Sequence, residues 1–318
     1  MKTLLLVLVI TCILSMVFCR LLLPILRKMK AGQNILVYVK EHKNKSGTPT
    51  MGGLAFISAI LVVSALFITT AYRSVLITLA IAVSFAIVGL IDDLLKKRRK
   101  ENLGLRAYQK FAFQTLIALF AGIYGFRAGL TEVYIPFTYK SIELGVWVIP
   151  LSVFSFLSTV NAVNLTDGLD GLASLVSLPF FLAMGVIIAL QTSVENPLSV
   201  LSFSVAGGLI GYLLFNVSPA SLFMGDTGSL ALGGFASCVC VFSGNALYIP
   251  IIGVAFLFSV ISVVLQVIYY KASGGKRIFL MAPLHHHFQK KGYSESKISY
   301  AYFTVTFILG CICILFLA

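Results

Sequence analysis

Three consecutive histidines, His285, His286 and His287, stand between two strongly apolar segments near the C-terminus. Imidazole changes charge near neutral pH, donates hydrogen bonds when protonated and binds metals when neutral. One zinc site built from all three is disfavoured, because adjacent side chains diverge and no cysteine lies beside them. The tract therefore indicates contact with a charged substrate, and the plain alternative is a solvated loop.

Two adjacent carboxylates, Asp92 and Asp93, end the apolar run 75–91. At the C-terminus of a helix they meet the negative end of its dipole as well as each other, so they require a cation nearby. That cation can be a metal ion or a basic residue. The alternative is two ordinary ion pairs, Asp92–Lys96 and Asp93–Lys97, on a helix that continues into water.

The segment 161–171 reads NAVNLTDGLDG and follows another apolar run. Its polar side chains recur every third residue: Asn161, Asn164, Asp167 and Asp170. Such groups hydrogen-bond to a base or a ribose or bind a cation, and Gly168 permits a tight turn between them. The spacing differs from that of an EF-hand, which argues against a calcium loop. The alternative for Asp170 is a capping role at the start of the next helix.

Two further loops carry polar residues at the edges of apolar runs. Asp226 lies where a helix begins, among unpaired N–H groups that also suit phosphate, and its alternative role is that of an N-cap. Phe223, just before it, can stack on a base or anchor in the bilayer interface. The loop before run 51–71 holds Lys43 and Thr48 among glycines, which resembles a phosphate-binding loop but lacks the Walker spacing.

Long apolar runs position these loops. The 318-residue chain is 59% hydrophobic and 11% charged, whereas soluble proteins carry about 25% charged residues. Runs of roughly 18 or more apolar residues cross the ~30 Å hydrocarbon core as helices. The hydropathy pattern predicts an all-α polytopic membrane protein, a single domain over residues 1–318 with about ten transmembrane helices. The expected helices are 3–26, 51–71, 75–91, 109–127, 146–163, 172–191, 199–217, 228–244, 248–270 and 298–317.

Charge predicts the orientation of these helices. Nineteen of the 24 lysines and arginines fall in or beside the alternate loops 27–50, 92–110 and 271–297. Basic loops stay in the cytoplasm, and the first run is expected to remain as a helix rather than to be cleaved as a signal peptide, so both termini are predicted outside. Eight of the eleven carboxylates, including all five aspartates, lie on the predicted cytoplasmic side. Ionisable residues near the membrane are costly and usually functional.

The polar loops at this one membrane face are expected to form one site. Carboxylates that hold Mg²⁺, lysines that bind phosphate oxygens and amides that bind a nucleoside together describe phosphoryl transfer. At the membrane edge one substrate can be a lipid and the other a soluble nucleotide, and no nucleic acid is expected as a partner. A secondary transporter is the alternative of another class, although transporter sites lie near the midplane of the bilayer.

Four stretches in this order resemble the polyprenyl-phosphate N-acetylhexosamine-1-phosphate transferases. They are GTPTMGG (47–53), NAVNLTDGLDGL (161–172), FMGDTGSLALG (223–233) and APLHHHF (282–288). The resemblance covers nearly the whole chain. The triple histidine favours the muramoyl-pentapeptide branch over the sister branch that uses UDP-N-acetylglucosamine (UDP-GlcNAc). Gln289 departs from the pattern, which has a glutamate after HHHF.

The resemblance implies an activity, a cofactor and a location. A member of this branch transfers phospho-MurNAc-pentapeptide from UDP-MurNAc-pentapeptide to undecaprenyl phosphate, with Mg²⁺, giving UMP and lipid I for peptidoglycan synthesis. It is expected in the bacterial plasma membrane as a homodimer, with the active site facing the cytoplasm. Direct attack by the lipid phosphate and a covalent aspartyl-phosphate route both remain open.

The resemblance also implies roles for individual residues. Asp226 is expected to bind the metal ion, and Asp92 to act as a base or to contact the lipid phosphate, with Asp93 beside it. The histidines are expected at the sugar-phosphate or peptide end. The residues expected around uridine diphosphate are Asn164, Asp167, Gly168, Asp170, Asn216 and Phe223. Those expected on the phosphate side are Lys43, Thr48 and Lys110.

Overall fold

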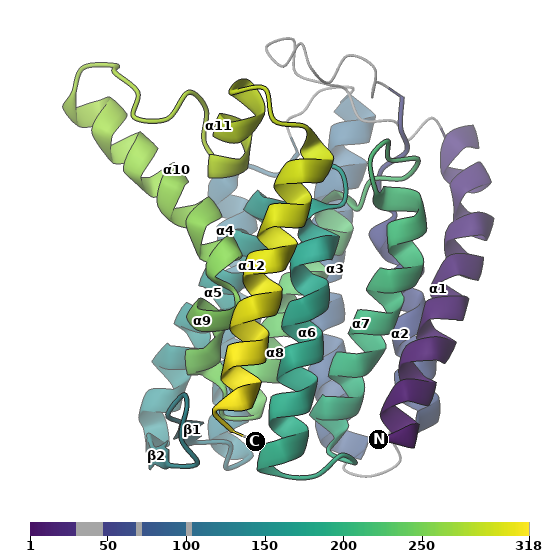
Figure 1. Cartoon of the computed structure of the whole chain (residues 1–318), viewed down its shortest axis with the longest axis vertical. Coiled ribbons are helices and arrows are strands. Elements are labelled where there is room, and N and C mark those ends of the chain that lie inside the picture. The colour runs from purple at the N-terminus through teal and green to yellow at the C-terminus, as the bar shows by residue number, and fades with distance from the viewer. Residues whose placement is uncertain (30–46, 68–71, 100–103, 318) are drawn as a thin grey trace.

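The computed structural model describes residues 1–29, 47–67, 72–99 and 104–317. Within these ranges the chain forms a bundle of long helices with a small hairpin at one end (Figure 1). The long helices are α1 (Lys2–Lys28), α2 (Gly53–Phe67), α3 (Tyr72–Arg99), α4 (Ala107–Arg127), α5 (Val148–Thr166), α6 (Leu172–Gln191), α7 (Pro197–Asn216), α8 (Gly225–Phe242), α10 (Val254–Ala272) and α12 (Glu295–Leu315). The short ones are η2 (Gly145–Trp147), η3 (Ala246–Tyr248), α9 (Ile249–Ile252) and α11 (Leu284–Lys290). Strand β1 (Glu132–Tyr134) pairs antiparallel with β2 (Ser141–Glu143), with Val133 opposite Ile142.

The all-α polytopic prediction is confirmed, because every predicted apolar run forms a helix. Eight helices in the described ranges are long and apolar enough to cross a membrane. Of the two remaining long helices, α2 has 15 residues and is too short by this measure. Helix α4 has 21 residues, but Gln109, Lys110 and Gln114 lower its mean hydropathy. The expected limit of the third helix was too early: α3 continues beyond residue 91 to Arg99.

Both chain termini lie at one end of the bundle, and helix α11 with the turn between α5 and α6 lies at the other (Figure 1). Helix α10 leans away from the bundle and leaves large apolar side chains such as Ile261, Val264 and Ile268 exposed. Such a surface suits contact with lipid tails rather than with water. The expectation that the end of the bundle with α11 and the turn between α5 and α6 faces the cytoplasm stays a prediction.

Small residues let the helices approach closely. The backbones of α1 and α7 come so near that a Cβ atom on Gly207 would lie 2.2 Å from the carbonyl oxygen of Leu8. The same interface is joined by a hydrogen bond from Ser15 Oγ to the carbonyl oxygen of Gly208, 2.7 Å long. Close backbone approach and side-chain hydrogen bonds are the main attractions between helices inside a membrane, where lipid tails are as apolar as leucine.

Helix α8 lies at the centre and is buried along nearly its whole length. Its first turn is held by glycines on two neighbouring helices. A Cβ atom on Gly89 of α3 would lie 2.1 Å from the carbonyl oxygen of Asp226, and one on Gly53 of α2 would lie 2.2 Å from Cα of Gly228. These glycines therefore bring α2 and α3 against the start of α8.

Replacing Gly89 is expected to loosen this contact. In Gly89→Ala the new methyl group meets backbone atoms, which cannot rotate away, so the variant should lose about 1–3 kcal/mol of stability. Thermal unfolding in detergent measures the loss. Gly125→Ala on α4 is the matched control, because its Cβ atom would meet no atom closer than 3.7 Å. Equal melting of the two variants would contradict the close approach of α3 and α8.

Candidate functional site

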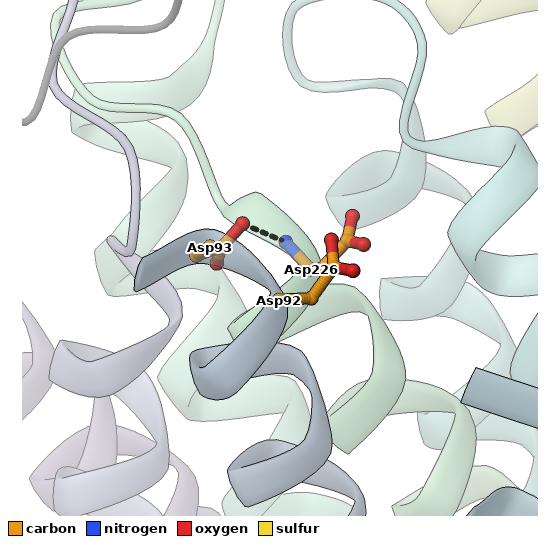
Figure 2. A group of neighbouring side chains, drawn as sticks. All are labelled: Asp92, Asp93 and Asp226. Atoms are coloured by element: carbon orange, nitrogen blue, oxygen red, sulfur yellow. Dashed lines mark hydrogen bonds between the residues drawn. The ribbon is translucent and has the colours of Figure 1, made fainter. Parts of the chain in front are cut away.

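The buried carboxylate of Asp93 holds the start of α8. Its Oδ1 accepts the backbone N–H of Asp226 at 3.1 Å, and its Oδ2 accepts the N–H and the hydroxyl of Thr227 at 2.9 and 2.7 Å. Figure 2 shows Asp93 turned toward the backbone nitrogen of Asp226. A carboxylate at this end of a helix satisfies unpaired N–H groups and meets the positive end of the dipole. The suggested Asp93–Lys97 pair is therefore wrong, since Asp93 serves α8 instead.

Asp92, on the same turn of α3, has different partners. Its Oδ1 accepts the backbone N–H of Leu105 at 2.7 Å, and its Oδ2 lies 2.7 Å from Nζ of Lys96. The suggested i,i+4 pair of Asp92 with Lys96 is thus confirmed. The side chain of Asp92 is only 4% exposed, and it is held in place by a backbone group on one side and an ammonium group on the other.

Asp226 is the residue on which charged groups from different helices converge. Its Oδ2 lies 2.6 Å from Nζ of Lys110 on α4 and 3.1 Å from Nζ of Lys96 on α3. Its Oδ1 accepts a hydrogen bond from the amide of Asn164 on α5, at 3.1 Å. Asp226 is not an N-cap, because Met224 holds that position and Asp226 lies in the first turn. Its carboxylate is directed instead toward the two lysines.

Asn164 is oriented by three of its neighbours. Its amide nitrogen donates to Asp226 and, at 2.8 Å, to the hydroxyl of Ser229. Its amide oxygen accepts from Nζ of Lys110 at 3.3 Å. Since both ends of the amide have matching partners, the side chain is fixed beside the carboxylate. Three predicted site residues that lie far apart in the sequence, Asn164, Lys110 and Asp226, thus come together.

The three carboxylates of Asp92, Asp93 and Asp226 form the only group of its kind in the described part of the chain that could hold a metal ion. Their oxygens lie within 4.8 Å of one another, and Lys96 and Lys110 supply two positive charges against three negative ones. One negative charge remains to be balanced. Carboxylate oxygens suit a hard divalent cation. Because Asp93 is bound to the N–H groups and the hydroxyl at the start of α8, whereas Asp226 and Asp92 are bound mainly by lysine side chains, Asp226 and Asp92 are better placed to be ligands.

The turn between α5 and α6 carries Asp167, Gly168 and Asp170. The backbone N–H of Ala220, in the loop before α8, donates to Oδ2 of Asp170 at 2.9 Å. Asp170 is therefore not the cap of α6; Gly171 occupies that position with φ of 72°. The carboxylate of Asp170 instead ties this turn to the loop between α7 and α8.

The segment 47–53 lies beside the loop that precedes α8. The N–H of Phe223 donates to the carbonyl oxygen of Pro49, and the N–H of Gly52 donates to that of Phe223, both at 2.8 Å. Thr48 and Phe223 are both half-buried where these two loop segments lie together. Lys43 lies outside the described residues. Thr48 and Phe223 thus belong to one surface, as a site built from both loops requires.

Asn216, at the end of α7, holds the loop between α7 and α8 in place. Its amide oxygen accepts from the hydroxyl of Ser174 at 3.0 Å, and its amide nitrogen donates to the carbonyl oxygen of Leu222 at 3.0 Å. The side chain is 3% exposed. In this structure Asn216 shapes the loop that carries Phe223, and its direct contact with a substrate stays a prediction.

The three histidines of α11 have different hydrogen-bond partners, but the expectation that their side chains diverge is wrong for His285 and His286, whose ring centroids lie 4.4 Å apart. His287 accepts the N–H of Leu280 on Nδ1 at 3.1 Å, and His286 contacts Gln289 at 3.0 Å. His285 is fully buried, and neither ring nitrogen has a hydrogen-bond partner among the described residues. Burial lowers the pKa of His285 well below its usual 6.5, and the charge of His286 lowers it further. Roles of the histidines in catalysis stay predictions.

His285 and His286 both lie against the turn between α5 and α6. A Cβ atom on Gly168 would lie 2.3 Å from Nε2 of His285 and 3.0 Å from Nε2 of His286. Glycine at 168 therefore lets the histidine helix reach this turn.

Several residues of the site are not indicated by the sequence. The spacing predicts Lys96 only as the partner of Asp92, yet Lys96 also contacts Asp226, 130 residues away. Thr227 and Ser229, next to Asp226 in the GDTGS motif, bind Asp93 and Asn164. The i,i+4 spacing signalled one contact of Lys96, but the second depends on how α3 packs against α8.

Comparisons with known proteins show which family this chain resembles. The family model described as Glycosyl transferase family 4 matches residues 74–244. A model described as Phospho-N-acetylmuramoyl-pentapeptide-transferase signature 1 matches residues 45–57. A protein of Clostridium botulinum (strain Eklund 17B / Type B) with the name phospho-N-acetylmuramoyl-pentapeptide-transferase is 41% identical over 93% of this chain and 90% of its own. Proteins of that name from Clostridium novyi (strain NT) and Listeria innocua are 42% and 40% identical, over 93% and 90% of this chain and 91% and 89% of their own.

Asp167 gives the site a testable pH dependence. Its partly buried position raises the pKa of this carboxyl from 3.8 to about 8, and the charges of Asp226 and Asp93 contribute. A group whose pKa is higher in the folded protein stabilises it when protonated, and this stability is lost as the pH rises from about 4 to about 8. With a chelator present, the unfolding temperature should therefore fall over this range. Asp167→Asn should flatten the fall, and an unchanged slope in this variant would exclude Asp167 as its source.

Proposed function

Because this chain belongs to glycosyl transferase family 4 and, within it, to the phospho-N-acetylmuramoyl-pentapeptide-transferases, we propose that it transfers phospho-MurNAc-pentapeptide from UDP-MurNAc-pentapeptide to undecaprenyl phosphate. The products are lipid I and UMP, and the reaction belongs to peptidoglycan synthesis. The observation that carries the proposal is the convergence of Lys96, Lys110 and Asn164 on the carboxylate of Asp226.

The charge of this cluster suits transfer of a phosphate group between two phosphorylated substrates. Catalysis of such transfer consists mainly of positioning the groups and stabilising their negative charge. Lys96 and Lys110 are placed to bind oxygens of the diphosphate, and Asp226 with Asp92 would hold Mg²⁺. When bound, Mg²⁺ supplies positive charge to the diphosphate and to the leaving UMP. The lysines then exchange one anionic partner for another, from carboxylate to phosphate.

Direct attack by the lipid phosphate fits the surroundings of Asp92 better than an aspartyl-phosphate does. Both oxygens of Asp92 are held by Leu105 N–H and Lys96, and those of Asp93 by the start of α8. A phosphate monoester has a second pKa near 6 and is mostly dianionic at pH 7. Removal of its proton therefore gains little, and Asp92 acts by orienting Lys96 and the cation.

The site end of the bundle is proposed to face the bacterial cytoplasm, where UDP-linked donors are soluble. Most basic residues of the chain lie in the sequence segments 27–50, 92–110 and 271–297, and basic residues of this kind concentrate on the cytoplasmic side of membrane proteins. The lipid substrate would enter from the bilayer, which the exposed apolar face of α10 adjoins. A homodimer, implied by the family, stays a prediction that mass measurement in detergent tests.

Asp226→Asn is expected to abolish Mg²⁺-dependent turnover while the protein stays folded. The substitution removes a charge that two lysines and the cation share, and the rate should fall about 100-fold or more. UMP release and thermal unfolding in detergent measure the two effects. Glu195→Gln, in the exposed loop between α6 and α7 at the far end of the bundle, should leave both unchanged. Near-normal turnover of Asp226→Asn would remove Asp226 from the site.

The donor distinguishes this branch from its sister. Purified protein with undecaprenyl phosphate and Mg²⁺ should release UMP from UDP-MurNAc-pentapeptide and not from UDP-GlcNAc, and chelation of the metal should stop the release. The enzyme should therefore discriminate through contacts beyond the uridine diphosphate that both donors share. Release only from UDP-GlcNAc would overturn the proposed substrate.

A further inference from the structure

Helices α4 and α5 are joined by side-chain hydrogen bonds at two levels. At the level of the site, Nζ of Lys110 donates to the amide oxygen of Asn164 at 3.3 Å. One turn deeper in the bundle, the amide nitrogen of Asn161 donates to Oε1 of Gln114 at 2.8 Å. Gln114 follows Lys110 by four residues and Asn161 precedes Asn164 by three. At these spacings the two residues of each helix lie on one face, so the deeper bond continues the contact that Lys110 makes.

The orientation of both deeper amides follows from a backbone carbonyl group. The amide nitrogen of Asn161 also donates to the carbonyl oxygen of Leu157, at 2.8 Å, and a carbonyl oxygen only accepts. Gln114 must therefore turn its Oε1 toward Asn161. Its Nε2 then points away from Asn161 and has no hydrogen-bond partner among the described residues, although the side chain is fully buried.

Stability alone does not account for a glutamine at position 114. A buried N–H group without an acceptor is costly, and a leucine of similar size would avoid that cost. The best-attested role of a buried polar group that is retained at such a cost is to specify the register of two helices. The hydrogen bond between Gln114 and Asn161 suits this role, because its length and direction allow only one alignment of α4 with α5.

Further from the site, α4 and α5 meet through small residues. A Cβ atom on Gly122 would lie 3.0 Å from the carbonyl oxygen of Ile149. Ala118 and Ala121 are buried in the same stretch of α4. Small residues let two helices approach closely but add no directional bond. A shift of α4 by one residue would move Lys110 by about 1.5 Å along the helix axis and turn it by about 100°.

We propose that Gln114 and Asn161 are positioning residues, whose hydrogen bond sets the register of α4 against α5. This register places the ammonium group of Lys110 2.6 Å from Asp226, where it can bind the diphosphate of the donor. Asn161 thus serves the contact between two helices rather than a base or a ribose. The kinetic part of the inference rests on the proposed function, whereas the placement of Lys110 does not.

Acetylation of the full-length protein with acetic anhydride, measured for each lysine by mass spectrometry, tests this placement without substrate. In Gln114→Leu the rate at Lys110 should rise several-fold, because its ammonium group is released from its charge-assisted hydrogen bonds. The exposed Lys140, in the hairpin at the other end of the bundle, is the internal reference. Thr115→Val, which removes a hydroxyl bonded within its own helix, should match wild type. An unchanged rate at Lys110 in Gln114→Leu, or an equal rise in Thr115→Val, would overturn the proposal.

Thermal unfolding in detergent separates positioning from a merely structural role. Gln114→Leu should unfold at the wild-type temperature or above, because it removes unpaired buried N–H groups and keeps the bulk of the side chain. Faster acetylation of Lys110 in a protein of unchanged stability is the expected combination. A lower unfolding temperature, with faster acetylation of Lys110 and Lys140 alike, would show general loosening and overturn the positioning role.

UMP release tests whether the register matters for the reaction. In Gln114→Leu, kcat/KM should fall about tenfold or more, since a misplacement of about 1 Å can cost that much. Gln114→Asn should also lose activity, because the shorter amide does not reach Asn161. Its combination with Asn161→Gln should recover most of the loss, since the longer amide then lies on the other helix. Wild-type rates in Gln114→Leu, or no recovery in the combination, would overturn the link to catalysis.

These outcomes separate the inference from the proposed function. If the protein released UMP from neither donor, the kinetic comparison would fail together with the proposed function. Acetylation of Lys110 would still decide whether Gln114 sets its position.

Discussion

The arrangement of the site depends on one buried carboxylate, that of Asp93, which binds the first N–H groups of α8. A buried carboxylate is costly unless it is fully hydrogen-bonded, and the start of a helix needs acceptors for its unpaired N–H groups. The N–H groups at the start of α8 supply the hydrogen bonds that the carboxylate needs, and the carboxylate supplies the acceptors that these N–H groups need. The contact fixes α8 along its axis and about it, and so decides where the neighbouring Asp226 directs its side chain. Gly89 belongs to the same constraint, since any larger residue would hold α3 away from α8.

Beside the fixed start of α8, the arrangement of the site depends on the balance between negative and positive side chains. Three carboxylates lie together with two ammonium groups at the edge of the bundle, where the surroundings screen charge less than water does. Lys96 and Lys110 keep the carboxylates stable before any ligand arrives and offer the same positive charge to a phosphate afterwards. The amide of Asn164, held by Ser229 and Lys110, adds a fixed dipole. The cluster is therefore organised for anions and cations alike, and this is what a transfer between two phosphorylated substrates requires.

Much of the fold could be predicted from the sequence, and much less of the site. Apolar runs predict the helices, because burial in lipid depends on composition along a single segment. The motifs predict that Asp226, Asn164 and the histidines lie at the same face of the membrane. The sequence did not indicate that Asp93 holds α8, that Asp170 binds a loop rather than capping α6, or that Lys96 reaches Asp226. Each of these depends on which side chains meet when distant helices pack, a property that spacing along the chain does not contain. The early end expected for α3 has another cause: the last turn of this helix carries Lys96, Lys97, Arg98 and Arg99, so hydropathy follows the helix only to the end of its apolar part.

The distance along the chain between Asp93 and its partners has a consequence for biosynthesis. Asp93 is separated from Asp226 by 133 residues, and at about 5–20 residues per second a ribosome needs roughly 7 to 27 seconds to synthesise them. During that interval α3 has Asp93 but not the helix whose N–H groups bind it, whereas the partners of Asp92, Lys96 and Leu105, follow soon after it in the chain. The newborn segment must keep this end in water or hold the carboxyl group of Asp93 protonated. The middle of translation is therefore the period in which this protein is most exposed to misinsertion and to quality-control proteases.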